Sequence, residues 1–226
     1  SHLLKENLRW RNLERLKKKI KIRDLIKMNN LQGVKVAFFG TPEFALETLR
    51  KLKENFAEII FVVTQPPKPS GRGQKKKYSS VYLWSKQNKI KVFAPKKINK
   101  IFFSDVVKKY QIDFIVIVAF GKILDDYILK YPKYMSLNVH ASLLPKWRGA
   151  APIQRALLNG DTTTGVSIMR VEKKLDSGPV ISLEKLEIKK KDNAGNLHNK
   201  LALIGADILI KTIIKIYQNN YNFKFQ

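Results

Sequence analysis

Residues 34–40 read VKVAFFG and are followed directly by TPEFA at residues 41–45. The apolar run has the length and composition of a strand that is buried on both faces. Thr41 can cap a helix and Pro42 suits the first helical turn, so we expect a helix to begin here. A strand, a tight glycine turn and a helix form the opening unit of a doubly wound sheet. The segment lacks the G-x-G-x-x-G pattern, so no dinucleotide is predicted.

The chain continues to alternate between strand and helix patterns. Strands are expected at residues 58–64, 91–93 and 113–119, and a helix is expected at residues 99–110. This alternation predicts an α/β, Rossmann-like fold with a mostly parallel sheet and helices on both faces. Ligands of such folds bind outside the carboxyl ends of the strands.

The last third of the chain predicts a strand pair and a long helix. Residues 163–171 and 180–188 alternate between apolar and polar side chains, which favours a hairpin-like pair. Residues 196–216 predict a helix whose apolar face carries Leu197, Leu201, Ile204 and Ile208. His198 falls off this face, and we expect it at the surface.

Composition excludes several kinds of chemistry. The 226 residues contain no cysteine and only three histidines, so disulfides, a thiol nucleophile and a His-rich metal cluster are not expected. No apolar run reaches membrane-spanning length. Lys and Arg number 44 against 18 acidic residues, giving a formal charge of +26. This excess fits a polyanionic partner, but a coding bias toward Lys, Asn and Ile explains it equally well.

A polar motif follows the middle of the chain. Residues 135–140 predict a short buried strand, and side chains two apart on a strand face the same way. Asn138 and His140 therefore project together at a strand end, where the amide can donate to an oxyanion and the imidazole can move a proton. Asp176 follows in the turn sequence KLDSGPV. The alternatives are a satisfied polar pair at the sheet rim and an Asp that only accepts local backbone hydrogen bonds.

Five motifs in order resemble those of the folate-dependent formyltransferases, and most of all those of members that act on methionyl-tRNA. The resemblance covers about residues 34–216. It is carried by FFGTPEFA from Phe38, TQPPKPSGRG from Thr64, VAFGKIL from Val118, SLNVHASLLPKWRGAAPIQRAL from Ser136 and TGVSIMRVEKKLDSGP from Thr164.

The resemblance implies formyl transfer from 10-formyltetrahydrofolate to the amino group of methionyl-initiator tRNA, without a metal, for translation initiation. Asn138 and His140 would be oxyanion donors, and Asp176 would orient His140 and move protons through a water molecule. The residues implied in folate binding are Val118, Phe120, Gly121, Ile123, Leu124, Ser142, Leu143, Leu144 and Pro145. Those implied in tRNA binding are Lys68, Arg72 as the principal contact, Lys75, Lys76, Lys77 and Arg148.

Two other functions remain open at the level of sequence. One is a formyltransferase for a small amine, either a nucleotide-linked amino sugar or glycinamide ribonucleotide. Family members that act on sugars lack the segment at residues 65–77, which we expect to be a basic loop without helix or strand. The other is a non-catalytic RNA-binding protein built on the same fold.

We expect three regions in the chain: a basic N-terminal extension at residues 1–32, a catalytic domain at residues 33–218 and a C-terminal tail at residues 219–226. The further C-terminal tRNA-binding domain that is usual in the family is expected to be absent. The extension is amphipathic and reads either as a targeting segment or as an extra helix that binds tRNA or packs on the domain. We expect a monomer that acts in a bacterial cytoplasm, or in a mitochondrion or plastid with bacterial-type translation.

Overall fold

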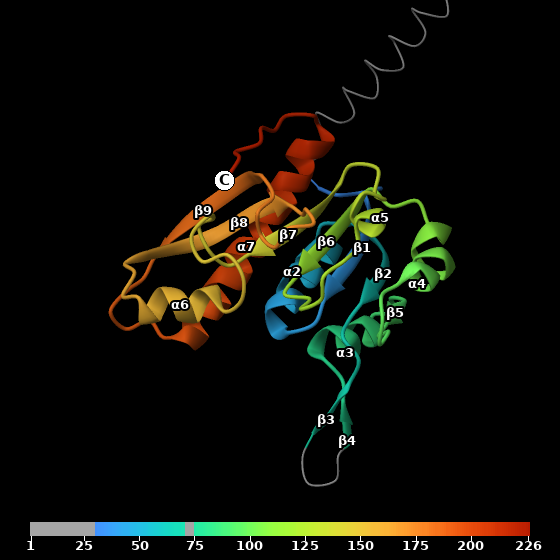
Figure 1. Cartoon of the computed structure of the whole chain (residues 1–226), viewed down its shortest axis with the longest axis horizontal. Coiled ribbons are helices and arrows are strands. Elements are labelled where there is room, and N and C mark those ends of the chain that lie inside the picture. The colour runs from blue at the N-terminus through green and yellow to red at the C-terminus, as the bar shows by residue number, and fades with distance from the viewer. Residues whose placement is uncertain (1–29, 71–74) are drawn as a thin grey trace, which may run out of the picture.

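The computed structural model describes residues 30–70 and 75–226 and contains a seven-stranded sheet in the order β5-β2-β1-β6-β7-β8-β9 (Figure 1). The strands from β5 to β7 are parallel, and β8 and β9 are antiparallel. The mostly parallel sheet confirms the predicted fold class. The strands are β1 (Lys35–Gly40), β2 (Glu58–Val63), β5 (Val92–Phe93), β6 (Phe114–Val118), β7 (Met135–His140), β8 (Thr163–Arg170) and β9 (Val180–Glu187).

Helices cover both faces of the sheet. One face packs against α2 (Glu43–Glu54), α3 (Ser80–Gln87) and α7 (Ala194–Tyr217), and α6 (Pro152–Leu158) joins this layer beside α7. The other face packs against α4 (Lys100–Asp105), the 3-10 helix η1 (Val107–Lys109) and α5 (Asp126–Leu129). In β1, Phe38 enters the first core and Phe39 the second, and both are fully buried. Two buried faces explain why this strand is apolar at successive positions.

Two predicted helix boundaries differ from the structure. The helix predicted over residues 99–110 is divided, because Val106 adopts φ −117° and ends α4 before η1 begins. The break lets Val107 enter the core, where it is fully buried. Thr41 does not cap α2, because the N-cap residue is Pro42. The Thr41 hydroxyl instead accepts a hydrogen bond from the backbone amide of Gln65 at 3.1 Å.

The prediction of no strand in residues 65–77 is wrong. β3 (Lys68–Ser70) and β4 (Lys75–Lys77) form an antiparallel pair that projects away from the main sheet (Figure 1). The two strands pair only with each other, so they need no buried apolar face. Pro69 is tolerated because a two-stranded ribbon consists of edges, where a missing N–H leaves no ladder position empty.

The segments at both ends of the described chain contact the sheet domain. Leu31 is fully buried in the core, and its amide donates to the Asn55 carbonyl at 2.8 Å. Near the other end, Val180 and Lys224 exchange backbone hydrogen bonds of 2.9 and 2.8 Å. Within residues 30–70 and 75–226, no helix has the length and apolar composition needed to cross a lipid bilayer.

Helix α7 packs against β7. The helix begins with a capping box between Asn193 and Asn196. A Cβ atom added at Gly205 would lie 2.8 Å from Cγ1 of Val139, the residue between Asn138 and His140 on β7. The absence of a side chain at Gly205 therefore lets the helix approach the strand closely.

We expect Gly205→Val to lower the free energy of unfolding by about 1–3 kcal/mol, because extra methyl groups overpack this contact. Urea denaturation followed by circular dichroism measures the change. Lys211→Val, at an exposed position of the same helix, is the matched control and should change stability by less than about 0.5 kcal/mol. Equal stability of the Gly205 variant and the wild type would contradict the close contact.

Candidate active site

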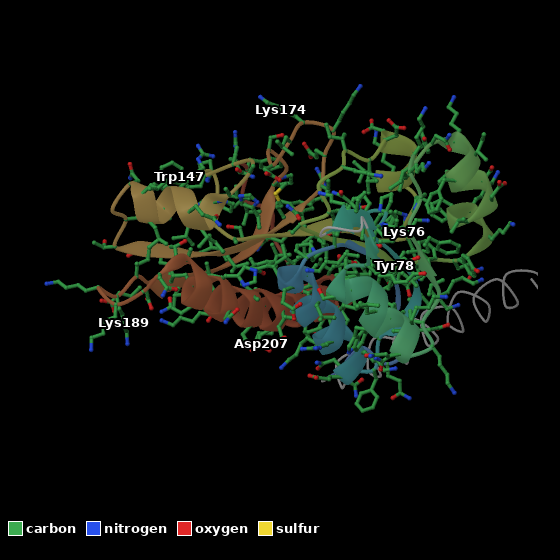
Figure 2. All side chains as sticks on the ribbon, turned by 90° about the horizontal axis from the view of Figure 1, so that it is seen from below. Lys76, Tyr78, Trp147, Lys174, Lys189 and Asp207 are labelled. Carbon is green, nitrogen blue, oxygen red and sulfur yellow. The ribbon has the colours of Figure 1, made fainter. Side chains whose placement is uncertain are left out.

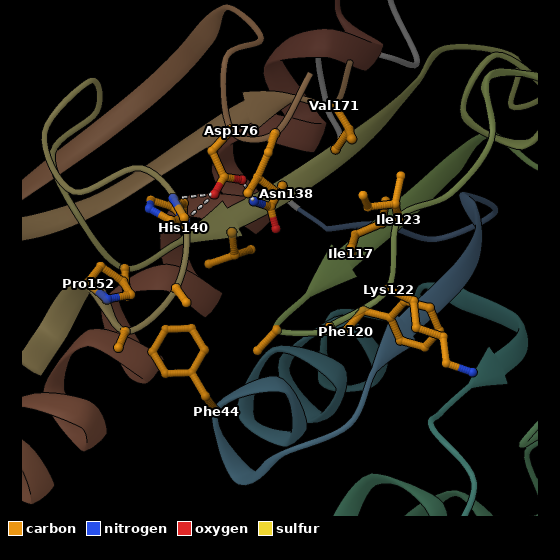
Figure 3. Close-up of a pocket in the computed structure, with 18 of the residues that line it drawn as sticks. Phe44, Ile117, Phe120, Lys122, Ile123, Asn138, His140, Pro152, Val171 and Asp176 are labelled. Carbon is orange, nitrogen blue, oxygen red and sulfur yellow. Dashed lines mark hydrogen bonds and ion pairs between the residues drawn. The ribbon is translucent and has the colours of Figure 1, made fainter. Parts of the chain in front are cut away.

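A cavity of about 600 Å³ opens at the carboxyl ends of β1, β6 and β7 (Figure 3). Its walls include Pro42 after β1, residues 119–124 after β6, and residues 138–141 at the end of β7. The chain leaves β1 toward β2 on one side, and β6 lies on the other side of β1. The cavity therefore lies at a topological switch point, where open α/β sheets bind their ligands.

Asn138, His140 and Asp176 meet on one wall of this cavity (Figure 3). The first two come from β7 and face the same way, as predicted, while Asp176 comes from the connection between β8 and β9. Asn138 Nδ2 lies 3.4 Å from Asp176 Oδ1, and His140 Nδ1 lies 3.7 Å from Asp176 Oδ2. The His140 and Asp176 side chains are only 8% and 12% exposed. The three residues thus form a compact and nearly buried polar set.

The Asp176 carboxylate is held by the loop that follows β7. Its Oδ2 accepts a hydrogen bond of 2.8 Å from the Gly149 amide. Asp176 adopts a left-handed backbone with φ 46°, as do its neighbours in the site Trp147 at φ 60° and Ala151 at φ 53°. Such conformations are costly for residues other than glycine and cluster where surrounding structure fixes a functional geometry.

Backbone contacts determine which nitrogen of His140 is available. Nε2 lies 2.9 Å from the Trp147 carbonyl oxygen. Because a carbonyl can only accept, Nε2 carries a proton and donates it. Nδ1 faces Asp176 at a distance beyond hydrogen-bond range. The ring can therefore gain or release a proton toward the cavity only at Nδ1.

Asp161 fixes the Trp147 segment from outside the cavity. Its side chain is 6% exposed, and its carboxylate accepts hydrogen bonds from Lys146 Nζ at 2.8 Å and Trp147 Nε1 at 2.7 Å. The pKa of Asp161 is lowered to about 2, and the hydrogen bond from Lys146 is the largest cause. Hydrogen bonds from Asn159 and then Trp147 are the next causes that lower it. Arg155 also stacks over the Trp147 ring at 4.8 Å. Trp147, whose carbonyl orients His140, is thus held through its indole by an ionised carboxylate.

The rest of the cavity wall is mainly apolar. The side chains that form it include Ile117, Phe120, Leu124 and Val171. Ile123 and Leu175 lie at the cavity with 79% and 64% of their surfaces exposed. Large apolar side chains that are exposed around a concave site favour a ligand with a flat apolar portion.

The structure brings only part of the predicted folate-binding set to the cavity. Phe120, Gly121, Ile123 and Leu124 line it, whereas fully buried Val118 does not. Residues 142–145 also lie outside its lining, since the chain folds back on itself directly after β7. There the Ser142 hydroxyl donates to the Lys146 carbonyl, and the Leu144 amide donates to Ser167 Oγ.

Two aromatic residues on the cavity wall were missed in the sequence. The rings of Phe44 and His198 pack edge to face with centroids 5.4 Å apart. His198 is half-buried, so the expectation of a surface residue is wrong. The first turns of α7 reach the cavity, and a position off the sheet-facing stripe faces the ligand space there. Phe44 could have been found from its place just after the carboxyl end of β1.

The predicted tRNA-binding residues fall in two places. Lys68, Lys76 and Lys77 are exposed on the hairpin, and Lys75 lies on β4. Arg72 lies outside the described residues. Arg148 stands beside Gly149 near the cavity, and its Nε donates to Gln226 Oε1 at 2.9 Å. Across the described residues, no three His, Asp or Glu side chains are grouped as metal ligands.

Residues 34–213 match the family model described as formyl transferase. The chain belongs to the formyl transferase family. It is 46% identical over 194 residues to the methionyl-tRNA formyltransferase of Sulfurihydrogenibium sp., covering 85% of this chain and 62% of that relative. It is 45% identical to the enzyme of the same name from Clostridium acetobutylicum, covering 83% and 60%. The chain thus spans about three fifths of the length of these curated relatives.

Solved structures of formyltransferases share the fold. Phosphoribosylglycinamide formyltransferase from Bacillus halodurans aligns with a TM-score of 0.67 and 24% identity, covering 80% of this chain and 94% of that one. The N-formyltransferase from Helicobacter canadensis, solved with folinic acid and dTDP-3-aminofucose, aligns with a TM-score of 0.63 and 23% identity, covering 85% and 67%. At these identities the likeness is one of fold alone.

We expect Asp161→Asn to lower stability at pH 6, with the deficit shrinking as the pH falls from about 4 to about 2. A carboxylate whose folded pKa is about 2, against an ordinary 3.8, stabilises the fold above pH 4 and loses that contribution as it is protonated. Urea unfolding at pH 6, 4 and 2.5 measures the deficit.

The control for this experiment is Asp207→Asn, which removes an exposed ion pair with Lys51. Exposed pairs contribute about 0–1 kcal/mol, so this variant should unfold almost as the wild type does. A deficit of the Asp161 variant that stays constant between pH 6 and 2.5 would contradict the role of the ionised carboxylate.

Proposed function

We propose that this domain transfers a formyl group from 10-formyltetrahydrofolate to the amino group of methionyl-initiator tRNA. The observation that carries the proposal is the convergence of Asn138, His140 and Asp176 on an apolar cavity at the sheet switch point. Membership of the formyl transferase family supports the reaction class. The names of the relatives that are 46% and 45% identical support the acceptor.

The cavity suits the folate co-substrate in size and chemistry. Its volume of about 600 Å³ lies within the usual range for small-molecule sites. Phe120, Ile123 and Leu124 offer apolar surface to a flat pterin ring, and Gly121 leaves backbone accessible beside them. These four residues are the proposed folate contacts. The formyl group would then lie toward the polar wall that holds Asn138 and His140.

The polar wall suits acyl transfer to an amine. The neutral amine forms a bond to the formyl carbon, and the bond from that carbon to folate N10 then breaks. A proton leaves the amine and another reaches N10, so the reaction needs no redox partner. The carbonyl oxygen becomes an oxyanion in between, and Asn138 Nδ2 is placed to donate a hydrogen bond to it. His140 supplies a second donor through Nδ1 when that nitrogen also carries a proton.

Asp176 faces the free ring nitrogen of His140. Its Oδ2 lies 3.7 Å from Nδ1, which is beyond hydrogen-bond range, so Nδ1 stays available to the ligand. The Gly149 amide keeps that oxygen in place. We therefore assign His140 the oxyanion and proton-transfer role, and Asp176 the orientation of His140 and proton movement.

The basic β3–β4 hairpin supports tRNA as the acceptor of the formyl group. Lys68, Lys76 and Lys77 are exposed there and can hold phosphates. By the same proposal, Lys75 and Arg72 on this segment and Arg148 near the cavity also contact the tRNA. Binding by these cations should weaken as the salt concentration rises.

We expect Asn138→Ala and His140→Ala each to lower kcat/KM by roughly hundreds-fold, because each removes an oxyanion donor worth about 3–4 kcal/mol of barrier. The measurement is formylation of charged initiator tRNA with 10-formyltetrahydrofolate. Ser177→Ala is the control, since this exposed hydroxyl beside Asp176 donates only to the Lys174 carbonyl. Near wild-type turnover in either alanine variant, with folding intact, would refute the assignment.

We expect Arg72→Ala to lower kcat/KM for charged tRNA while leaving folate binding, measured by calorimetry, unchanged. The variant loses a cation that would bind phosphate. Arg72 is far in sequence from the residues that line the folate cavity. Glycinamide ribonucleotide and nucleotide-linked amino sugars serve as competing acceptors in the same assay. Formylation of one of these, but never of tRNA, would overturn the proposed acceptor.

A further inference from the structure

Two tyrosine rings stack at the base of the β3–β4 hairpin. Tyr78 follows β4 directly, Tyr82 lies in the first turn of α3, and their ring centroids are 4.4 Å apart at an interplanar angle of 24°. Tyr78 is 38% exposed, and Tyr82 is half-buried. Because one face of the Tyr78 ring lies on Tyr82, its exposed surface belongs to the edge and the opposite face.

The start of α3 holds this pair in place. Ser79, the N-cap residue between the two tyrosines, accepts a hydrogen bond on its hydroxyl from the Tyr82 amide at 3.1 Å. On the other side, β4 ends one residue before Tyr78 and is paired to β3. Both rings are therefore ordered in advance, which lowers the entropic cost of stacking a third ring on them.

Positive charge surrounds the pair. Lys76 lies near Tyr78 in Figure 2, and Lys77 pairs across the hairpin with Lys68; all three lysines are exposed. The sequence contains no acidic residue between Glu58 and Asp105. No acidic side chain from this stretch of sequence neutralises these lysines, so they can attract a polyanion.

The base of the hairpin is joined to the wall of the cavity. Gln65, which precedes β3, donates from Nε2 to the Phe120 carbonyl at 2.8 Å, and Phe120 lines the cavity. Gly121 permits this contact: its φ is +73°, and a Cβ there would lie 2.6 Å from Gln65 Nε2. The segment that leads into the hairpin is therefore in direct contact with the cavity wall.

We propose that the Tyr78–Tyr82 stack is a platform for an unpaired nucleobase of the RNA whose end enters the cavity. Sites for single-stranded nucleic acid combine aromatic rings, which stack on bases, with cations, which hold the phosphates. The stack supplies the first element, and Lys68, Lys76 and Lys77 supply the second. This inference rests on the proposed function, and adds the residues that would receive a base.

The test uses the full chain and a short RNA hairpin with a four-nucleotide unpaired 3′ tail in which one base is replaced by 2-aminopurine. Stacking on the platform should quench the fluorescence of this base. We expect Tyr78→Ala to abolish the quenching and to weaken binding by roughly five- to a hundred-fold. Tyr78→Phe keeps the ring and should retain both signals.

Two further variants separate stacking from charge and from general truncation. Lys76→Gln should weaken binding and reduce its salt dependence, yet leave quenching at saturating RNA unchanged. Leu83→Ala removes another exposed apolar side chain of α3 and should leave both signals as in the wild type. Thermal unfolding by circular dichroism shows that each variant is folded.

The outcomes distinguish this inference from the function on which it rests. If the wild type formylates charged tRNA while Tyr78→Ala binds and quenches as the wild type does, the platform is refuted and the function stands. If the wild type quenches the RNA through Tyr78 but formylates no tRNA, the platform is supported and the function is refuted. RNA binding by the wild type without any quenching also overturns the platform.

Discussion

The parallel pairing of β6 with β7 is the constraint on which the site depends. It places Ile117 opposite Asn138, and these are the two half-buried positions in otherwise buried strands. One strand contributes apolar surface and the other a hydrogen-bond donor to the same wall of the cavity. A shift of this register by one residue would turn Asn138 into the core and Val139 toward the ligand. The register is protected because Leu137 and Val139 are buried against the opposite layer.

The polar residues of the site are supported by contacts with the loop that follows β7. Asp161 holds the Trp147 indole, the Trp147 carbonyl engages His140 Nε2, and the Gly149 amide holds Asp176. Asp161 and Trp147 thus hold the site without lining the cavity, as is common where side chains must be positioned closely.

The local parts of this arrangement could be predicted from the sequence. The strand at Met135–His140 and the shared direction of Asn138 and His140 follow from the two-residue period of a strand. The approach of Asp176 to them depends on how a distant connection folds over the Gly149 loop, and no local pattern encodes that. The resemblance to a known family, rather than periodicity, indicated Asp176.

The errors have the same origin. The β3–β4 hairpin was missed because lysine and proline are poor strand formers, whereas the structure needs only mutual backbone pairing there. His198 was placed at the surface because the helix pattern reveals its sheet-facing stripe but not what stands beyond the helix end. Residues 142–145, which the resemblance implies in folate binding, lie outside the lining of the cavity, and their role stays a prediction.

The paired segment that extends from the domain has a thermodynamic consequence of its own. β3 and β4 are hydrogen-bonded to each other and to no strand of the seven-stranded sheet. Their amides can therefore exchange with deuterium through local opening, at a free-energy cost well below that of global unfolding. Sequence changes in this ribbon should accumulate with little effect on the cooperativity of the core. A molecule with this division can change the sequence of its hairpin while keeping the same sheet framework.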